Sequence, residues 1–121
     1  MARNNLLGCW GESIAAEYLR KKRYAILECN YKTRFGEIDV IAKKRNTVVF
    51  AEVKMRKSAD FAQAREFVDY YKQKRLIAAA EYWISTNDPD LQYRFDVIEI
   101  YAPQGTETKH PKIVHWEDAF Q

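Results

Sequence analysis

A short apolar strand that runs directly into two opposite charges constrains the fold of this chain more than any other feature. Residues 48–51 read Val-Val-Phe-Ala, a run typical of a strand buried on both faces. Glu52 and Lys54 follow at once. Because side chains alternate along a strand, these two charges share one face and lie roughly 7 Å apart. Charged groups in such a place are costly unless they are paired or bound to a metal, so we expect partners for them nearby.

The preceding strand carries a further carboxylate. Residues 37–42 alternate, and a polar turn at residues 43–46 makes a hairpin with the buried strand. The side chains expected on one side of the first strand are Ile38, Val40 and Ala42. With a two- or four-residue loop, we expect Asp39 opposite Phe50, on the face of Glu52 and one diagonal step from it. A three-residue loop would place the two carboxylates on opposite faces unless a bulge intervenes.

Apolar periodicity and turn residues predict the remaining elements. The predicted helices span residues 5–22 and 60–86, and the predicted strands span residues 24–31, 37–42, 47–55, 94–101 and a short 112–116. The order α-β-β-β-α-β-β favours an α/β fold, with a mixed central sheet flanked by helices. No repeat or linker interrupts residues 1–121, so we expect a single domain.

Composition excludes several classes of protein. Hydrophobic residues make up 47% of the chain, enough for a core that needs no disulfides. The two cysteines, Cys9 and Cys29, form no CxxC motif, and we expect reduced thiols in a cytoplasmic protein without a zinc site. No apolar stretch is long enough to span a membrane.

The carboxylates and the lysine suggest a chemistry. Asp39 and Glu52 converging on one point would offer oxygen ligands to Mg²⁺ or Mn²⁺, and the backbone carbonyl of Val53 is a further candidate ligand. Lys54 beside that metal would orient the attacking water or stabilise charge on a phosphate, as phosphodiester hydrolysis requires. The structural alternative is a Glu52–Lys54 ion pair with Asp39 capping a loop, and from spacing alone that alternative is the commoner outcome.

Basic residues are clustered, although the net charge is only +3. The clusters lie at residues 20–23, 43–45, 54–57 and 72–75. Each alone is typical of a solvated turn or helix end. If several met on one face they would form a phosphate-binding surface. The residues then expected to contact nucleic acid are Arg56, Lys57, Gln73 and Lys74.

Two helical charges are additional catalytic candidates. Glu12 shares helical spacing with small and apolar residues, so it is either a third acid that reaches the metal or a side chain that caps a backbone group. Lys72 lies on an apolar helix face and either contacts a phosphate or extends its ammonium group to the solvent. The residues that share the face of Lys72 are Val68, Leu76, Ala79 and Trp83.

Other polar and aromatic residues are expected to be structural. Asp96 should pair with Arg94 or a neighbouring strand, and His115 should be packed or hydrogen-bonded rather than catalytic. The tryptophans and tyrosines should lie mostly in the core. For Tyr70 and Tyr71, stacking on nucleic-acid bases is the alternative.

The motifs also resemble known families. Asp39 followed by Glu52-Val53-Lys54 after a hairpin resembles the PD-(D/E)xK nuclease signature, with Ile38 in place of the proline. Archaeal Holliday-junction resolvases look similar and also place a glutamate on the first helix. A closer resemblance, to the YraN-like family of small bacterial proteins, runs over nearly the whole chain. It rests on Gly8-x-x-Gly11-Glu12, Gly36-Glu37-Ile38-Asp39, Glu52-Val53-Lys54-x-Arg56, Lys72-Gln73, Arg94-Phe95-Asp96 and the closing residues 115–120, His-Trp-Glu-Asp-Ala-Phe.

The resemblance implies a restriction-endonuclease-like fold and a cytoplasmic bacterial setting. It implies a Mg²⁺- or Mn²⁺-dependent endonuclease that acts on DNA, including branched or damaged DNA, and that works as a homodimer. One departure is the segment of residues 58–63, which lacks an expected glycine. Because a fold does not guarantee an activity, the alternatives are a non-catalytic nucleic-acid-binding module and a scaffold whose charges only hold the sheet ends.

Overall fold

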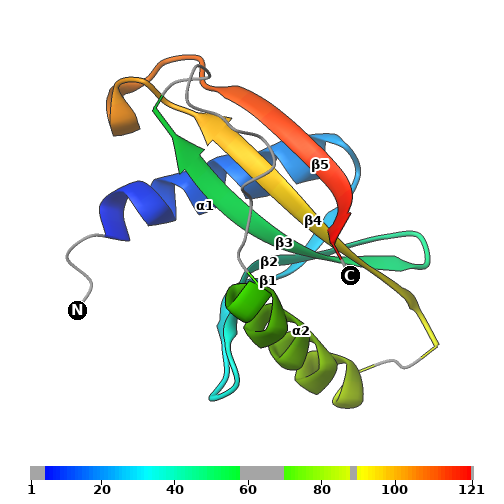
Figure 1. Ribbon diagram of the computed structural model, residues 1–121. Helices are drawn as coiled ribbons and strands as arrows, with labels where there is room; N and C mark the ends of the chain where they lie inside the picture. Colours follow the sequence, from blue (N-terminus) through cyan, green and yellow to red (C-terminus); the bar gives the residue numbers. More distant parts are fainter. Residues whose placement is uncertain (1–4, 58–69, 88–89, 121) are drawn as a thin grey trace.

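The computed structural model describes residues 5–57, 70–87 and 90–120, and Figure 1 shows their arrangement. The elements are α1 (Asn5–Lys21), β1 (Ala25–Lys32), β2 (Glu37–Lys44), β3 (Thr47–Arg56), α2 (Tyr70–Ser85), β4 (Gln92–Tyr101), the short 3₁₀ helix η2 (Gly105–Glu107) and β5 (Lys112–Phe120). This order of helices and strands confirms the prediction. The last strand is longer than predicted, and predicted helical residues 60–69, with the departing segment 58–63, lie outside the described residues.

The five strands form one mixed sheet in the order β1-β2-β3-β4-β5. Strands β3 and β4 are parallel, whereas the other neighbouring pairs are antiparallel. A parallel pair needs a crossover connection, and α2 lies in the segment that connects β3 to β4. The predicted α/β fold with a mixed sheet is therefore confirmed. None of the helices in the described part of the chain is long and apolar enough to cross a membrane.

The register of the β2–β3 hairpin corrects one prediction. Lys44 pairs with Thr47 across a two-residue turn, so Phe50 pairs with Ile41 and not with Asp39. The pairing is displaced by two positions from the one expected. A displacement of two keeps every side chain on its face. Continued one residue past the last pair, Val40↔Ala51, the register sets Asp39 directly across from Glu52.

Helices cover both faces of the sheet and give three layers (Figure 1). Against α1, the core consists mainly of Ala15, Leu19, Val40, Ala42, Val49, Ala51, Ile98 and Ile100. Against α2, it consists of Ile38, Ile41, Val48, Phe50, Leu76, Ala79, Ala80 and Trp83. The prediction that Ile38 shares a side with Val40 and Ala42 was wrong. Alternation fails just beyond the last β2–β3 pair, although β1 still pairs with β2 there through Tyr31↔Ile38. Between this pair and Cys29↔Val40, Asn30 of β1 has a φ of 54°, outside the extended conformation of a regular strand.

Two glycines allow close packing next to acidic residues. A Cβ atom on Gly11 would run into the Sδ atom of Met55, so this glycine lets α1 lie directly on β3. A Cβ atom on Gly36 would run into the backbone carbonyl oxygen of Arg75, so the β1–β2 turn lies directly on α2. These contacts draw both helices and the turn toward the end of the sheet where β2 begins.

Candidate functional site

Asp39 and Glu52 form a carboxylate pair at the end of the β2–β3 ladder. Asp39 Oδ2 accepts a hydrogen bond of 2.8 Å from the backbone N–H of Val53. The Asp39 side chain thus takes the place of the next ladder bond beyond Val40↔Ala51. Glu52 is only 6% exposed, and its carboxyl group is close enough to share a hydrogen bond with Asp39.

This pair is electrostatically unfavourable when both groups are ionised. Burial and then the charge of Glu52 raise the pKa of Asp39 to about 7, and the charge of Glu12 acts in the same direction. The Val53 N–H stabilises the carboxylate and opposes this rise, but it does not outweigh burial and charge. The pair therefore holds a proton up to near-neutral pH unless another cation replaces it.

Two lysines approach the pair from different elements. Lys72 Nζ on α2 lies 2.9 Å from Glu52 Oε2. Burial alone would lower the pKa of Lys72, but the hydrogen bond and charge of Glu52 raise it overall. Burial and then the positive charge of Lys72 lower the pKa of Lys54. In the part of the chain that the structure describes, the ion pair of Glu52 is with Lys72, and no Glu52–Lys54 ion pair is present.

Glu12 joins the cluster from the α1 side. Burial raises its pKa, as do the negative charges of Glu37 and then Glu52, whereas the nearby Asp39 carboxyl group opposes this rise. The five residues predicted as catalytic therefore come from four elements, α1, β2, β3 and α2, and meet at one end of β3.

The four residues predicted to bind nucleic acid are more dispersed. Arg56 is engaged by buried Glu99, with Nε and Nη2 at 3.0 and 2.9 Å from Oε2. Lys57 is exposed just after β3. On α2, Lys74 is exposed and Gln73 is half-buried. The structure thus brings Arg56 into an internal ion pair, while both lysines face the solvent.

The candidate metal ligands are two carboxylates and one backbone group. Among residues 5–57, 70–87 and 90–120, no group of three His, Cys, Asp or Glu side chains is placed to hold a metal ion. A cation here would have Asp39 and Glu52 as its side-chain ligands. In a strand, the N–H and C=O of one residue point to the same edge, so the carbonyl of Val53 is directed to the edge where its N–H meets Asp39. Mg²⁺ usually keeps several water ligands, and a site with this few protein ligands therefore suits it.

A second polar cluster is structural, as predicted. Asp96 accepts hydrogen bonds of 2.8 Å from both Nε and Nη2 of Arg94. His115 Nε2 lies 2.7 Å from Asp96, and its Nδ1 lies 3.1 Å from the Tyr18 hydroxyl. These contacts confirm that Asp96 pairs with Arg94 and that His115 is a packed, hydrogen-bonded group.

Sequence reasoning missed several residues near the cluster. Arg75 follows Lys72 by three positions, a spacing that places both on one helix face and could have identified it. Glu37 lines the same cavities as Arg75. The expectation that Tyr70 and Tyr71 lie in the core was wrong, since they are 63% and 77% exposed. Both come at the start of α2, before its buried face begins at Leu76.

Comparisons with known proteins identify the family. The sequence profile of the family described as "Uncharacterised protein family UPF0102" matches residues 11–100. A UPF0102 protein of Flavobacterium psychrophilum is 45% identical over 120 residues, covering 99% of this chain and 98% of the relative. A UPF0102 protein of Caldanaerobacter subterraneus subsp. tengcongensis is 49% identical over 115 residues, covering 94% and 93%. The chain therefore belongs to the UPF0102 family, the YraN-like group that its motifs resemble.

Proposed function

We propose that this protein is a Mg²⁺- or Mn²⁺-dependent endonuclease that hydrolyses phosphodiester bonds of DNA on a restriction-endonuclease-like fold. The observation that carries the proposal is the meeting of Asp39 and Glu52 with Lys54 and Lys72 at one end of β3. Branched or damaged DNA is the proposed substrate, and the proposed setting is the bacterial cytoplasm.

The chemistry of the cluster supports a cation site. Two neighbouring carboxylates repel each other once both are ionised, and burial, followed by this repulsion from Glu52, raises the pKa of Asp39 to about 7. Oxygen ligands of this kind suit Mg²⁺ and Mn²⁺. A cation held by Asp39 and Glu52 would polarise the scissile phosphodiester and acidify the attacking water.

Each side chain has a distinct proposed role. Asp39 and Glu52 bind the cation, and the Val53 N–H fixes the Asp39 carboxylate in place. Lys54, whose pKa is lowered, presents an ammonium group to the developing charge on the phosphate. Lys72 positions Glu52 through their ion pair, and Glu12 adds negative charge beside Asp39.

A non-catalytic nucleic-acid-binding module is the competing function, and one observation favours it. Lys72 already neutralises Glu52 at 2.9 Å, so the cluster has an internal partner for one carboxylate. In that case the lysines would bind phosphate, and the carboxylates would only set the spacing between them. This module needs no divalent cation, which makes the two functions separable by experiment.

A metal-screened cleavage panel tests the proposal. Purified protein is incubated with single-stranded, duplex, flap and four-way DNA and with RNA, in Mg²⁺, Mn²⁺, Ca²⁺ or EDTA. We expect cleavage of DNA in Mg²⁺ or Mn²⁺ and none in EDTA. The matched variant is Asp39→Asn, which keeps an oxygen for the Val53 N–H but removes the charge. Cleavage by this variant at the wild-type rate would show that the cleavage comes from another site or from a contaminating nuclease.

A further inference from the structure

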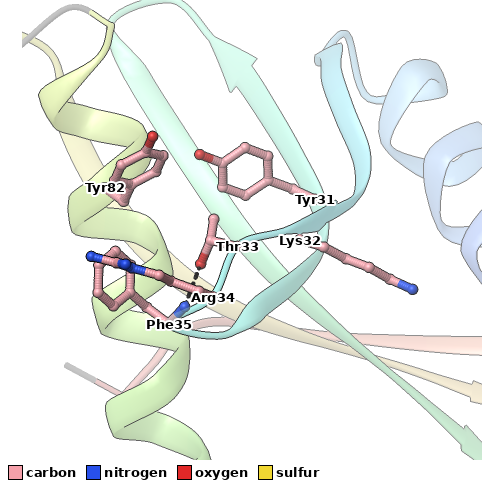
Figure 2. A pocket seen from close by; sticks show the side chains of 6 residues that line it. All are labelled: Tyr31, Lys32, Thr33, Arg34, Phe35 and Tyr82. Carbon is pink, nitrogen blue, oxygen red and sulfur yellow. Dashed lines mark hydrogen bonds between the residues drawn. The ribbon is translucent and has the colours of Figure 1, made fainter.

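A cavity of about 440 Å³ lies between the β1–β2 turn and α2 (Figure 2). Its lining consists of Tyr31, Lys32, Thr33, Arg34, Phe35 and Tyr82. Sites for small organic ligands typically measure about 300–1,000 Å³ and combine aromatic walls with a few polar groups. This cavity has both features.

The aromatic walls come from two different elements. Phe35 in the turn and Tyr82 on α2 are 42% and 47% exposed, and their ring centroids are 5.8 Å apart. The Arg34 guanidinium lies over the Phe35 ring at 5.1 Å from its centroid. Figure 2 shows Tyr31 and Tyr82 directed toward one another across the opening. Flat aromatic and guanidinium surfaces therefore surround an accessible space.

The wall formed by the turn is held in a fixed position. Thr33 Oγ1 accepts hydrogen bonds from the N–H groups of Phe35 and Gly36, at 3.0 and 3.1 Å. Its hydroxyl also donates to the Gly36 carbonyl at 3.0 Å. Gly36 in turn lies against the backbone of Arg75 on α2. Binding here would therefore cost little ordering of the turn.

The cavity continues toward the carboxylate cluster. A second, smaller cavity shares Lys32 and Thr33 with it, and a third cavity shares Glu37 and Arg75 with the second. The last of them is also lined by Lys72, which contacts Glu52. Along α2, Lys72 and Tyr82 are separated by a rise of about 15 Å, roughly four nucleotides at the axial spacing of one DNA strand.

The charge along this path is mainly positive. The cations that line the three cavities are Lys32, Arg34, Lys72 and Arg75, whereas the described acid among the lining residues is Glu37. A row of cations that ends in exposed aromatic rings matches the chemistry of a nucleic-acid strand, with phosphates on the cations and a base on the rings. An apolar peptide carries no negative groups that would pair with these cations.

We propose that the aromatic cavity binds one unpaired nucleobase of a DNA strand whose phosphates follow Arg75 and Lys72 to the carboxylate pair. This inference deepens the proposed endonuclease function, and it rests on that function for the claim that the bound strand is cleaved. It names the substrate class as DNA with an unpaired nucleotide a few positions from the cleaved bond. Base stacking on Phe35 and Tyr82 selects that class, because a base inside an intact duplex cannot reach the rings.

Fluorescence titration in EDTA tests the base site without catalysis. The probe is a short oligothymidylate that carries one 2-aminopurine, whose emission falls when it stacks. We expect quenching by the wild-type protein, and Phe35→Ala or Tyr82→Ala should weaken binding about tenfold, within the range for loss of one base–aromatic stack. Tyr82→Phe keeps the ring and should restore both affinity and quenching.

The matched control is Leu27→Ala. Leu27 is 40% exposed on the same hairpin but lines a different cavity, so its truncation should leave affinity unchanged. Equal loss in Leu27→Ala and Phe35→Ala would overturn the proposal. So would a Phe35→Ala protein that binds normally but changes oligomeric state in light scattering, since the rings would then serve a second copy of the chain.

The two proposals fail in different ways. Ring-dependent binding of the oligonucleotide without any metal-dependent cleavage would support the base site and reject the endonuclease. Cleavage that falls in Asp39→Asn but is unchanged in Phe35→Ala, on duplexes with or without an unpaired base, would support the endonuclease and reject the base site. Circular dichroism on each variant establishes that the fold is retained.

Discussion

The Asp39 carboxylate has one structural role, which the structure shows, and one proposed role, as a cation ligand. Its Oδ2 satisfies the Val53 N–H at 2.8 Å, in the place of a strand hydrogen bond. The same group sits beside Glu52 in a buried environment that raises its pKa from 3.8 to about 7. The hydrogen bond needs only an oxygen, whereas binding a cation needs the charge. Substitution by asparagine separates the two roles.

The first prediction is a pH effect on stability. Because the pKa of Asp39 is raised on folding, its protonation stabilises the fold fully below about pH 4, and this contribution is lost as pH rises through about 7. We expect the metal-free melting temperature of the wild type to fall more steeply over this window than that of Asp39→Asn. Titrating groups that do not interact with Asp39, such as Asp96, are common to both proteins and cancel in the comparison.

Added Mg²⁺ or Mn²⁺ at pH 8 provides the second half of this test. A ligand that binds only the folded state raises the melting temperature. The wild type should therefore gain stability from either cation, and Asp39→Asn should not. An equal gain in both proteins would place the cation elsewhere on the molecule.

A second prediction at this scale concerns Lys54. Lys54→Ala should lower turnover by about 100- to 10,000-fold, the range for one acid–base or electrostatic group. DNA affinity should fall only modestly, because the other cations along the strand path remain. The fold should survive, since Glu52 keeps its ion pair with Lys72. Single-turnover cleavage, binding and melting curves on this variant provide the three measurements.

Lys112→Ala is the matched control, because Lys112 is an exposed lysine on β5. Its turnover should equal that of the wild type. A Lys54→Ala protein that still cleaves at the wild-type rate would remove this lysine from the mechanism. A marked loss of stability with no cleavage in the wild type would favour a purely structural cluster.

At the scale of elements, the sequence predicted what depends on local patterns. Alternation and turn residues identified the helices, the strands and their order, because these signals act over a few residues. The face shared by Asp39 and Glu52 also follows from a period of two. The register of the β2–β3 hairpin does not follow from this period, since a shift of two residues leaves the pattern of polarity unchanged. Sequence placed Asp39 against Phe50, whereas the two-residue turn places it against Glu52.

Contacts between distant elements could not be predicted in the same way. The ion pair of Lys72 with Glu52 depends on how α2 crosses the sheet, which no local signal specifies. The pairing of Arg56 with Glu99 joins two parallel strands across the same crossover. The cavity at Phe35 and Tyr82 likewise requires the β1–β2 turn to meet α2. In the sequence, the only sign of the contact between this turn and α2 is Gly36, the glycine that permits it.

The third prediction tests that glycine. In Gly36→Ala, the new Cβ would run into the Arg75 carbonyl oxygen, so the turn must move away from α2. We expect a loss of about 1–3 kcal/mol in the free energy of unfolding, as for other overpacked sites. Binding of the 2-aminopurine probe should weaken as well, because one wall of the cavity shifts.

Gly8→Ala is the control for this change. A Cβ on Gly8 meets nothing within 4 Å, and the residue lies within α1. Alanine favours a helix over glycine, so this variant should be unchanged or more stable by up to about 1 kcal/mol. Urea denaturation of both variants measures the difference. A Gly36→Ala protein as stable as Gly8→Ala would show that the turn does not depend on its contact with α2.

For the whole molecule, the main question is how one small domain would cut a double-stranded substrate. The carboxylate pair of Asp39 and Glu52 lies at one end of β3 and would serve one scissile phosphate. A duplex or a junction presents two strands of opposite direction. A two-fold symmetric dimer would present two such sites with matching symmetry, as closed homo-oligomers generally do.

The last prediction is therefore a homodimer in the active complex. Light scattering should give twice the mass of the 14.3 kDa chain, at least when DNA is bound. On a supercoiled plasmid that carries one cleavable site, a dimer should convert circles to linear DNA with little nicked intermediate, because both strands are cut in one encounter. Mixing the wild type with Lys54→Ala should raise the nicked fraction, since a mixed dimer has one competent site. A monomeric mass at every concentration, with nicked circles accumulating first, would show that the chain cuts one strand at a time.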